Sequence, residues 1–255
     1  MVLAGYIGTM RGRSALQVAI VLAVVGIATA AVGGERFIPV VAQVQGAEGA
    51  YWNTELWVSN VSDAVGTYVL TFLPSGSDNS RLLAEEVSPV SIGPGETVHL
   101  RDVVPPGSTG ALRFTASEGV VVRCRVYNAR GQSSVGQMVP ALTREEMVRA
   151  GGEGVLVPLV RSSSFRTNVG FFNPGENTIR VHAVLVDAHG QRVGAASYGV
   201  EPGSQVQIND FLLSYRVSKA DGYQVVLTAN DAFAAYATIV DSRSGAAVFV
   251  LPVVR

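Results

Sequence analysis

The sequence predicts an all-β protein of two tandem antiparallel β-sandwich domains, preceded by a signal or anchor helix. Short apolar runs with period-two alternation recur at the spacing of sandwich strands. One pattern, of roughly 100 residues, occurs twice, around Tyr51–Asn60 and again around Ser164–Gly175. Charged residues make up only 15% of the chain and hydrophobic residues 48%. Because disorder goes with high charge and low hydrophobicity, this composition favours folded domains.

Four segments follow from the repeat. A capping-box pattern, Thr143 followed by Glu146, opens a short helix between the copies, and Gly151 and Gly152 end it. The predicted segments are residues 1–32 (signal peptide or uncleaved membrane anchor), 33–142 (first sandwich repeat), 143–153 (helical linker) and 154–255 (second sandwich repeat).

The amino terminus is typical of a secretory signal peptide. Arg11 and Arg13 precede an apolar run over residues 18–32, and Ala28–Ala30 supplies the small residues of a cleavage site. An uncleaved anchor is the alternative, although a spanning helix needs about 20 apolar residues. Either way we expect export of residues 33–255, to a secreted, periplasmic or extracellular surface location, with membrane contact only through this segment. The start, Met1 or Met10, stays open.

Charge and cysteine content exclude several functions. The formal net charge of −1 gives no electrostatic basis for binding nucleic acid. Cys124 is the only cysteine, so the chain can form neither an internal disulfide nor a cysteine-based metal cluster, and its mid-strand position indicates core packing. The three histidines have no metal-ligand spacing, and we expect neither a metal nor a cofactor.

Each copy opens with an apolar run containing a proline, Phe37–Val41 or Val155–Val160, which we expect at an edge or entry position because proline lacks a ladder donor. The next strand ends at an asparagine, Asn60 or Asn173, that favours a turn. Its expected inward residues are Leu56 and Val58 in the first copy, and Val169 and Phe171 in the second.

The remaining strands also match between the copies. We expect a third strand, a weaker fourth run, a fifth strand opened by Pro-Gly and closed by Asp, a sixth strand, a long seventh strand and a closing strand. In order, these are Tyr68–Phe72 and Val181–Leu185, Arg81–Val90 and Arg192–Val200, Pro94–Asp102 and Pro202–Asp210, Leu112–Thr115 and Val225–Thr228, Val122–Val126 and Ala235–Ile239, and runs ending at Pro140 and Pro252.

The candidate binding surface lies on the side of these strands that faces away from the cores. Alternation places Trp57, Arg123, Arg125 and Tyr127 on this side in the first copy, and Phe172 and Tyr236 in the second. Aromatic residues and arginine are enriched at protein interfaces, and aromatic platforms also bind sugars. The alternative is that this side packs internally, against the linker or the other copy.

Asp102 and Asp210 are the repeated polar pair, each at the end of a strand. Each could act as a general base or a calcium ligand, but calcium needs six to eight oxygens and few are near. We favour a carboxylate that caps loop N–H groups. No nucleophile, metalloprotease or phosphate-loop motif occurs, so we predict a protein that is not an enzyme, with a hydrolase using Asp102 or Asp210 the less favoured alternative.

The shared plan of the copies resembles secreted bacterial immunoglobulin-like β-sandwich repeats over Phe37–Val254: an apolar-proline start, an aromatic-x-Thr strand ending in Asn, and Pro-Gly-x-x-Val-x-x-x-Asp. The resemblance implies adhesion, spacer or binding roles and carries over no active residues. We therefore predict an exported structural or macromolecule-binding protein of the adhesion or scaffold type, whose partner is a protein or polysaccharide at the cell surface. A carbohydrate-binding module using Trp57, Tyr127, Phe172 and Tyr236 is the alternative.

Overall fold

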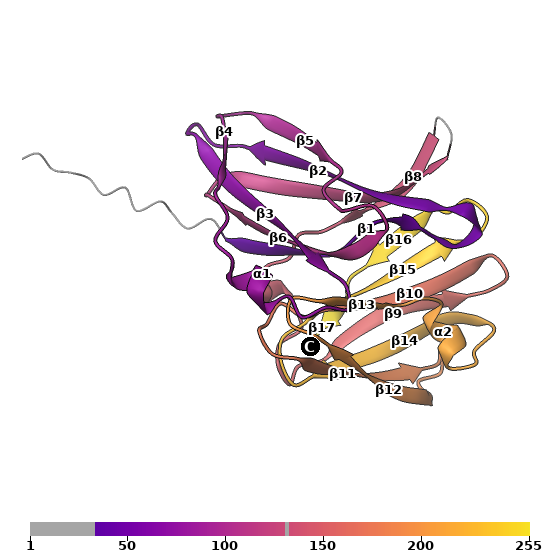
Figure 1. Cartoon of the computed structure of the whole chain (residues 1–255). Helices are drawn as coiled ribbons and strands as arrows, with labels where there is room; N and C mark the ends of the chain where they lie inside the picture. The colour runs from indigo at the N-terminus through magenta and orange to yellow at the C-terminus, as the bar shows by residue number, and fades with distance from the viewer. Residues whose placement is uncertain (1–33, 131–132) are drawn as a thin grey trace, which may run out of the picture. The chain divides into compact units, whose positions relative to one another are not determined.

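A computed structural model describes residues 34–130 and 133–255, and nearly all of their regular structure is β (Figure 1). The expectation of an all-β chain is confirmed. The predicted signal or anchor segment, residues 1–32, lies outside the described residues. Among the described residues, none of the helices is long and apolar enough to cross a bilayer.

The strands of the first half join in the order β4-β3-β6-β1-β2-β7-β8, and β5 pairs with β2 on the outside of that path. β1 connects two layers, because it pairs with β6 from Glu35 to Gln43 and with β2 at Val44 and Gln45. Its register shifts between Ile38 and Val41, around the proline. The bounds are β1 (Glu35–Gln45), β2 (Tyr51–Asn60), β3 (Gly66–Pro74), β4 (Val90–Ile92), β5 (Thr97–Arg101), β6 (Ser108–Ala116), β7 (Val120–Arg130) and β8 (Ser133–Val139).

The second half has two sheets, β13-β10-β15-β16 and β12-β11-β14-β9-β17. The same pairing order occurs in the first half, where β5-β2-β7-β8 and β4-β3-β6-β1 are the matching layers. The bounds are β9 (Gly154–Arg161), β10 (Phe165–Phe172), β11 (Ile179–Val186), β12 (Arg192–Val200), β13 (Gln205–Ile208), β14 (Ala220–Ala229), β15 (Ala234–Asp241), β16 (Ala247–Val250) and β17 (Val253–Val254).

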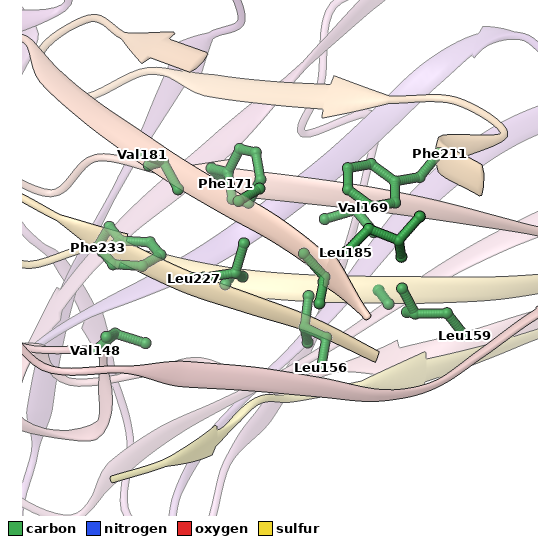
Figure 2. Close-up of a cluster of buried hydrophobic side chains, with 14 of the residues drawn as sticks. Val148, Leu156, Leu159, Val169, Phe171, Val181, Leu185, Phe211, Leu227 and Phe233 are labelled. Carbon is green, nitrogen blue, oxygen red and sulfur yellow. The ribbon is translucent and has the colours of Figure 1, made fainter. Parts of the chain in front are cut away.

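Each half buries an apolar core between its two layers. In the second half, Val169 and Phe171 of β10 pack with Leu156, Leu185 and Leu227 of the facing sheet (Figure 2). The first core is built in the same way, and its members include the predicted inward residues Leu56, Val58, Val122, Cys124 and Val126. Period-two alternation therefore identified the inward side of the central strands correctly.

The repeated threonines make the same hydrogen bonds in both halves, and the repeated asparagines both donate to turn carbonyls and accept from the backbone N–H two residues on. Thr54 Oγ1 accepts from Ala42 N–H and donates to Ala42 O, each at 2.9 Å, and Thr167 makes the same two bonds with Val160. Asn173 Nδ2 donates to three carbonyls of its turn region while its Oδ1 accepts from Gly175 N–H. These buried side chains satisfy backbone groups that the ladders leave unpaired, as expected for turn residues.

A third apolar cluster, the junction cluster, joins the two halves. Phe37 of β1 and Phe172 of β10 are both fully buried there, with ring centroids 5.2 Å apart. The members are Phe37, Leu73, Ala111, Leu142 and Met147 from the first half and the linker region, and Phe172 and Ala234 from the second half. The described residues belong to one compact unit.

The helical segments are shorter than predicted, or new. The capping box is present, with Thr143 N–H donating to Glu146 Oε2 at 2.8 Å, but it begins only the 3₁₀ turn η2 (Arg144–Glu146). The expected fourth strand over residues 81–90 was wrong for most of its length, because α1 (Ser80–Ala84) packs Leu82 and Leu83 against the junction cluster. The other short helical segments are η1 (Ala47–Gly49) and α2 (Phe211–Ser214).

Because of the junction, we expect alanine substitutions at the two ends of β10 to differ in how much they destabilise the protein. Phe172→Ala should lower the free energy of unfolding by about 3–5 kcal/mol, because it opens a cavity in the junction cluster. Phe165→Ala is the matched control, since Phe165 is 40% exposed on the same strand, and it should cost less than about 1 kcal/mol. Urea unfolding measures both, and equal losses would contradict a packed junction.

Candidate functional site

The predicted outward residues of the first half lie on β2 and β7, in one layer with β5 and β8. In the antiparallel register, Trp57 of β2 lies opposite His99 of β5 and Arg123 of β7. Glu55 lies opposite Arg101 and Arg125 in the next outward row. We call this side the β2 outer face; it consists of Glu55, Trp57, His99, Arg101, Arg123, Arg125 and Tyr127. The structure therefore brings together all four residues predicted for the first copy.

A buried carboxylate organises the β2 outer face. The side chain of Glu55 is only 8% exposed and accepts from Arg125 Nη1 at 2.9 Å through Oε1. Its other oxygen, Oε2, lies 3.0 Å from His99 Nε2. A buried charge is costly unless it is paired, so Glu55 holds both neighbours in place.

Ring contacts add to this arrangement. Trp57 stacks on His99 with centroids 4.7 Å apart and planes within 9° of parallel. The guanidinium of Arg125 lies 4.8 Å above the centre of the Tyr127 ring, a cation–π contact, and its Nη2 donates to Ser134 Oγ at 2.8 Å. Trp57, Arg125 and Tyr127 are thus held by neighbours on the same face.

Exposed polar side chains complete the surface. Arg101, Arg123 and His99 are exposed, whereas Trp57, Arg125 and Tyr127 are partly buried. Three arginines stand around the single carboxylate Glu55, so the β2 outer face is positive while the chain as a whole has a formal charge of −1. Such a face can bind acidic groups by charge and present apolar ring edges beside them.

Sequence reasoning missed Glu55, His99 and Arg101. All three stand at positions that alternate with core residues, such as Leu56 on β2 and Leu100 on β5. The alternation that identified Trp57 therefore also placed them outward, but the pairing of β5 with β2 was needed to bring His99 beside Glu55.

The prediction that Phe172 and Tyr236 contribute to a binding surface was wrong. Both side chains are fully buried. They do point away from the second core, but Phe172 packs in the junction cluster against the first half, and Tyr236 stacks on Phe249 with centroids 5.3 Å apart. The alternative, that this face packs against the other copy, holds for the second half.

Tyr236 serves as a buried hydrogen-bonding group. Its ring covers Gly170 so closely that a Cβ there would collide with it. Its hydroxyl accepts from Gln205 Nε2 and donates to Gln207 Oε1 at 3.1 Å. Burial raises the pKa of Tyr236, with the Gln205 hydrogen bond acting weakly in the opposite direction, so the phenol stays protonated at neutral pH.

The two repeated aspartates occupy left-handed backbone conformations, with φ of 56° at Asp102 and 46° at Asp210. Aspartate is among the few residues that adopt this conformation, which explains its recurrence. Asp210 does not cap loop N–H groups as expected; it accepts from Arg161 Nε and Nη2 at 2.8 and 3.0 Å, while Asp102 is exposed. Asp210 lines a shallow hollow whose described lining includes neither a histidine nor a second carboxylate.

Cys124 is a core residue, as predicted. It is 1% exposed in the first core, and burial, with a smaller effect from the negative charge of Glu55, raises the pKa of the thiol. Within the described ranges, no group of three His, Cys, Asp or Glu side chains is arranged to hold a metal ion.

Comparisons with known proteins identify no family for this chain. No family model and no curated protein matches the chain. A lectin from Pleurotus ostreatus in complex with GalNAc is 11% identical, with 88% of this chain and 76% of that chain covered and a TM-score of 0.21. A glycosyl hydrolase family 2 member from Bacteroides cellulosilyticus is 10% identical, with 86% and 28% covered and a TM-score of 0.16. The chain thus spans under a third of the second protein, and neither likeness carries an argument.

Glu55→Gln should lower the free energy of unfolding by about 1–3 kcal/mol, because an amide cannot replace a charged acceptor shared by Arg125 and His99. Glu118→Gln, at an exposed turn position, is the matched control and should change it by less than about 0.5 kcal/mol. Chemical denaturation compares the two. An equal effect would contradict a structural role for the Glu55 ion pairs.

Cys124 should resist alkylation by iodoacetamide at pH 8 in the folded protein, because burial and the raised pKa suppress the thiolate. In urea it should react as an ordinary free thiol. Mass spectrometry of the labelled protein gives the fraction modified, and rapid complete labelling of the folded form would contradict core placement.

Proposed function

We propose that this chain is an exported, non-enzymatic binding protein of two tandem immunoglobulin-like sandwiches, which binds an acidic region of a partner protein through the β2 outer face. The observation that carries the proposal is the cluster of three arginines and two aromatic rings around Glu55 on one sheet surface. The signal-like amino terminus supports export.

The tandem arrangement is supported by the matching order of strand pairs in the two halves. It is also supported by the equivalent hydrogen bonds of Thr54 and Thr167, which join the first and second strands of each half. Duplication of one unit accounts for both, since it copies the strand order and the polar residues that satisfy the backbone together.

The composition of the β2 outer face suits a protein partner. Tryptophan, tyrosine and arginine are the residues that most often dominate binding energy at protein interfaces. Met138 of β8, 51% exposed and opposite Arg125 in the register, extends the surface with a flexible apolar side chain. A sheet surface that displays these groups side by side fits the flat geometry of a macromolecular interface better than that of a small-ligand pocket.

The contacts within the face lower the cost of binding. Arg125 is held by Glu55, Ser134 and the Tyr127 ring, and Trp57 by His99. Side chains fixed before association lose less conformational entropy when a partner binds. Exposed Arg101 and Arg123 remain at the surface, where charges mainly steer association and set specificity.

The alternative functions have less support. A sugar platform made of Trp57, Tyr127, Phe172 and Tyr236 loses its last two members to burial. One face of Trp57 is in contact with His99, and Tyr127 lies beneath Arg125. For a hydrolase, Asp210 is paired with Arg161 and no second acidic group lines its hollow among the described residues.

Poly-L-glutamate serves as the test probe for acidic recognition. Wild-type protein should bind it at low salt, and Arg123→Glu and Trp57→Ala should each weaken binding by about tenfold or more, because they remove a cation and an aromatic anchor from the face. Fluorescence anisotropy of labelled poly-L-glutamate measures the affinity, and binding should weaken as ionic strength rises.

Arg192→Glu is the matched control, since it makes the same charge change at an exposed position on β12. It should alter the affinity by less than about twofold, because salt screens exposed charges that lie more than a Debye length from the bound polymer. If Arg192→Glu and Arg123→Glu weaken binding equally, the attraction depends on net charge alone and the proposed surface is wrong.

A further inference from the structure

A cavity of about 490 Å³ lies between the first half and the layer β13-β10-β15-β16 of the second half. Its volume falls within the roughly 300–1,000 Å³ typical of ligand pockets. The wall includes Trp52 and Gln137, and exposed lining residues such as Gln45 and Gln207 open it to solvent. The floor side chains are Arg166, Asn168, Gln205, Gln207, Asn209 and Thr238.

A continuous chain of hydrogen bonds runs across this floor and fixes its side chains. Ser75 Oγ, 3.0 Å from Thr109 Oγ1, donates to Gln205 Oε1 at 2.6 Å. Gln205 Nε2 donates to the Tyr236 hydroxyl, which in turn donates to Gln207 Oε1. Gln207 Nε2 then donates to Asn209 Oδ1 at 2.8 Å. Side chains held in this way present their remaining hydrogen-bond donors and acceptors in fixed directions.

Several hydrogen-bonding groups of these amide side chains remain unpaired within the protein. A primary amide carries two N–H donors and an acceptor oxygen, so Gln205 and Gln207 each retain one N–H beyond the bonds described above. Gln205 is only 3% exposed. Gln137 Oε1 is buried and has no hydrogen-bond partner. Buried polar atoms are normally paired, so the Gln137 amide gains a hydrogen bond if it turns toward water or a ligand in the cavity.

The lining also restricts the chemistry of that ligand. Among the described lining residues, Arg166 carries the only charge and Trp52 the only aromatic ring. Six side chains are amides, and valine and alanine residues line much of the remaining wall. An apolar ligand would leave the amides unpaired, and a strongly anionic one would find a single cation. Hydroxyl groups both donate and accept, which matches amides, and the indole offers an apolar surface for C–H groups.

We propose that this cavity is a binding site for a mono- or disaccharide, held by the amides of Gln137, Gln205 and Gln207. The site shares no residue with the β2 outer face, so it is independent of the function proposed above. It also differs from the sugar platform expected from the sequence, which relied on exposed rings.

The test titrates purified protein with glucose, galactose, mannose, glucuronic acid, maltose and cellobiose at millimolar concentration. The side-chain amide signals of Gln137, Gln205 and Gln207 in ¹⁵N–¹H spectra report binding directly. At least one of these sugars should shift all three sets of signals, because the ligand replaces water at each amide. No shift with any of the six sugars would overturn the proposal.

Two variants locate the binding. Gln137→Leu removes the unpaired buried oxygen, so the melting temperature should stay equal or rise while saccharide affinity falls about tenfold or more. Gln207→Ala changes an exposed floor residue and should weaken binding to a similar extent. Unchanged affinity in both variants would overturn the proposal.

Trp57→Ala serves as the control on the β2 outer face and should leave saccharide affinity within about twofold of wild type. If Trp57→Ala abolishes saccharide binding and the two glutamine variants do not, the sugar binds the outer face, and the cavity assignment is wrong. Loss of poly-L-glutamate binding with retained saccharide binding is the expected result for Trp57→Ala, because the two sites are separate.

Discussion

The packing of the first half onto one face of the layer β13-β10-β15-β16 is the constraint on which the other features of this protein depend. Phe37 and Phe172 meet in the junction cluster, and Phe249 of β16 packs against the first core. The matching layers β5-β2-β7-β8 and β13-β10-β15-β16 each have two faces, and one face of each packs into the core of its own half. In the second half the other face is buried by this packing, whereas the equivalent face of the first half carries exposed arginines. The same strand order thus yields an internal contact in one half and a surface in the other.

Directional polar contacts complete the junction and set its geometry. Asn79, 3% exposed, donates through Nδ2 to Pro74 O and Gly203 O, and its N–H donates to Pro202 O. Apolar burial alone tolerates small sliding motions, but buried hydrogen bonds hold one arrangement because a broken one is costly. The cavity lies between the two halves, where amide side chains and apolar residues share the lining.

Glu55 connects the outer face to the core below it. Its neighbours on β2 and β7, Leu56 and Cys124, point into the first core, and its charge contributes to the raised pKa of the Cys124 thiol. The same carboxylate is balanced on the outer side by Arg125 and His99. A buried acid whose partners lie on one side requires those partners to stay in place. Arg125 is also held by Ser134 and the Tyr127 ring, and His99 by its stacking on Trp57.

The sequence by itself determined the features that depend on neighbouring residues: most of the strands, the inward side of each central strand, the Asn60 and Asn173 turns, and the outward side on which Trp57, Arg123, Arg125 and Tyr127 lie. These follow from period-two geometry and local hydrogen bonding. Only the tertiary structure decided what faces each outward side chain. Alternation places Trp57 and Tyr236 alike, yet Tyr236 is covered by contacts from residues distant in the chain. For the same reason residues 80–84 form helix α1, since Leu82 and Leu83 find apolar partners at the junction. The cavity likewise depends on the tertiary structure, because strands and loops far apart in the chain meet around it.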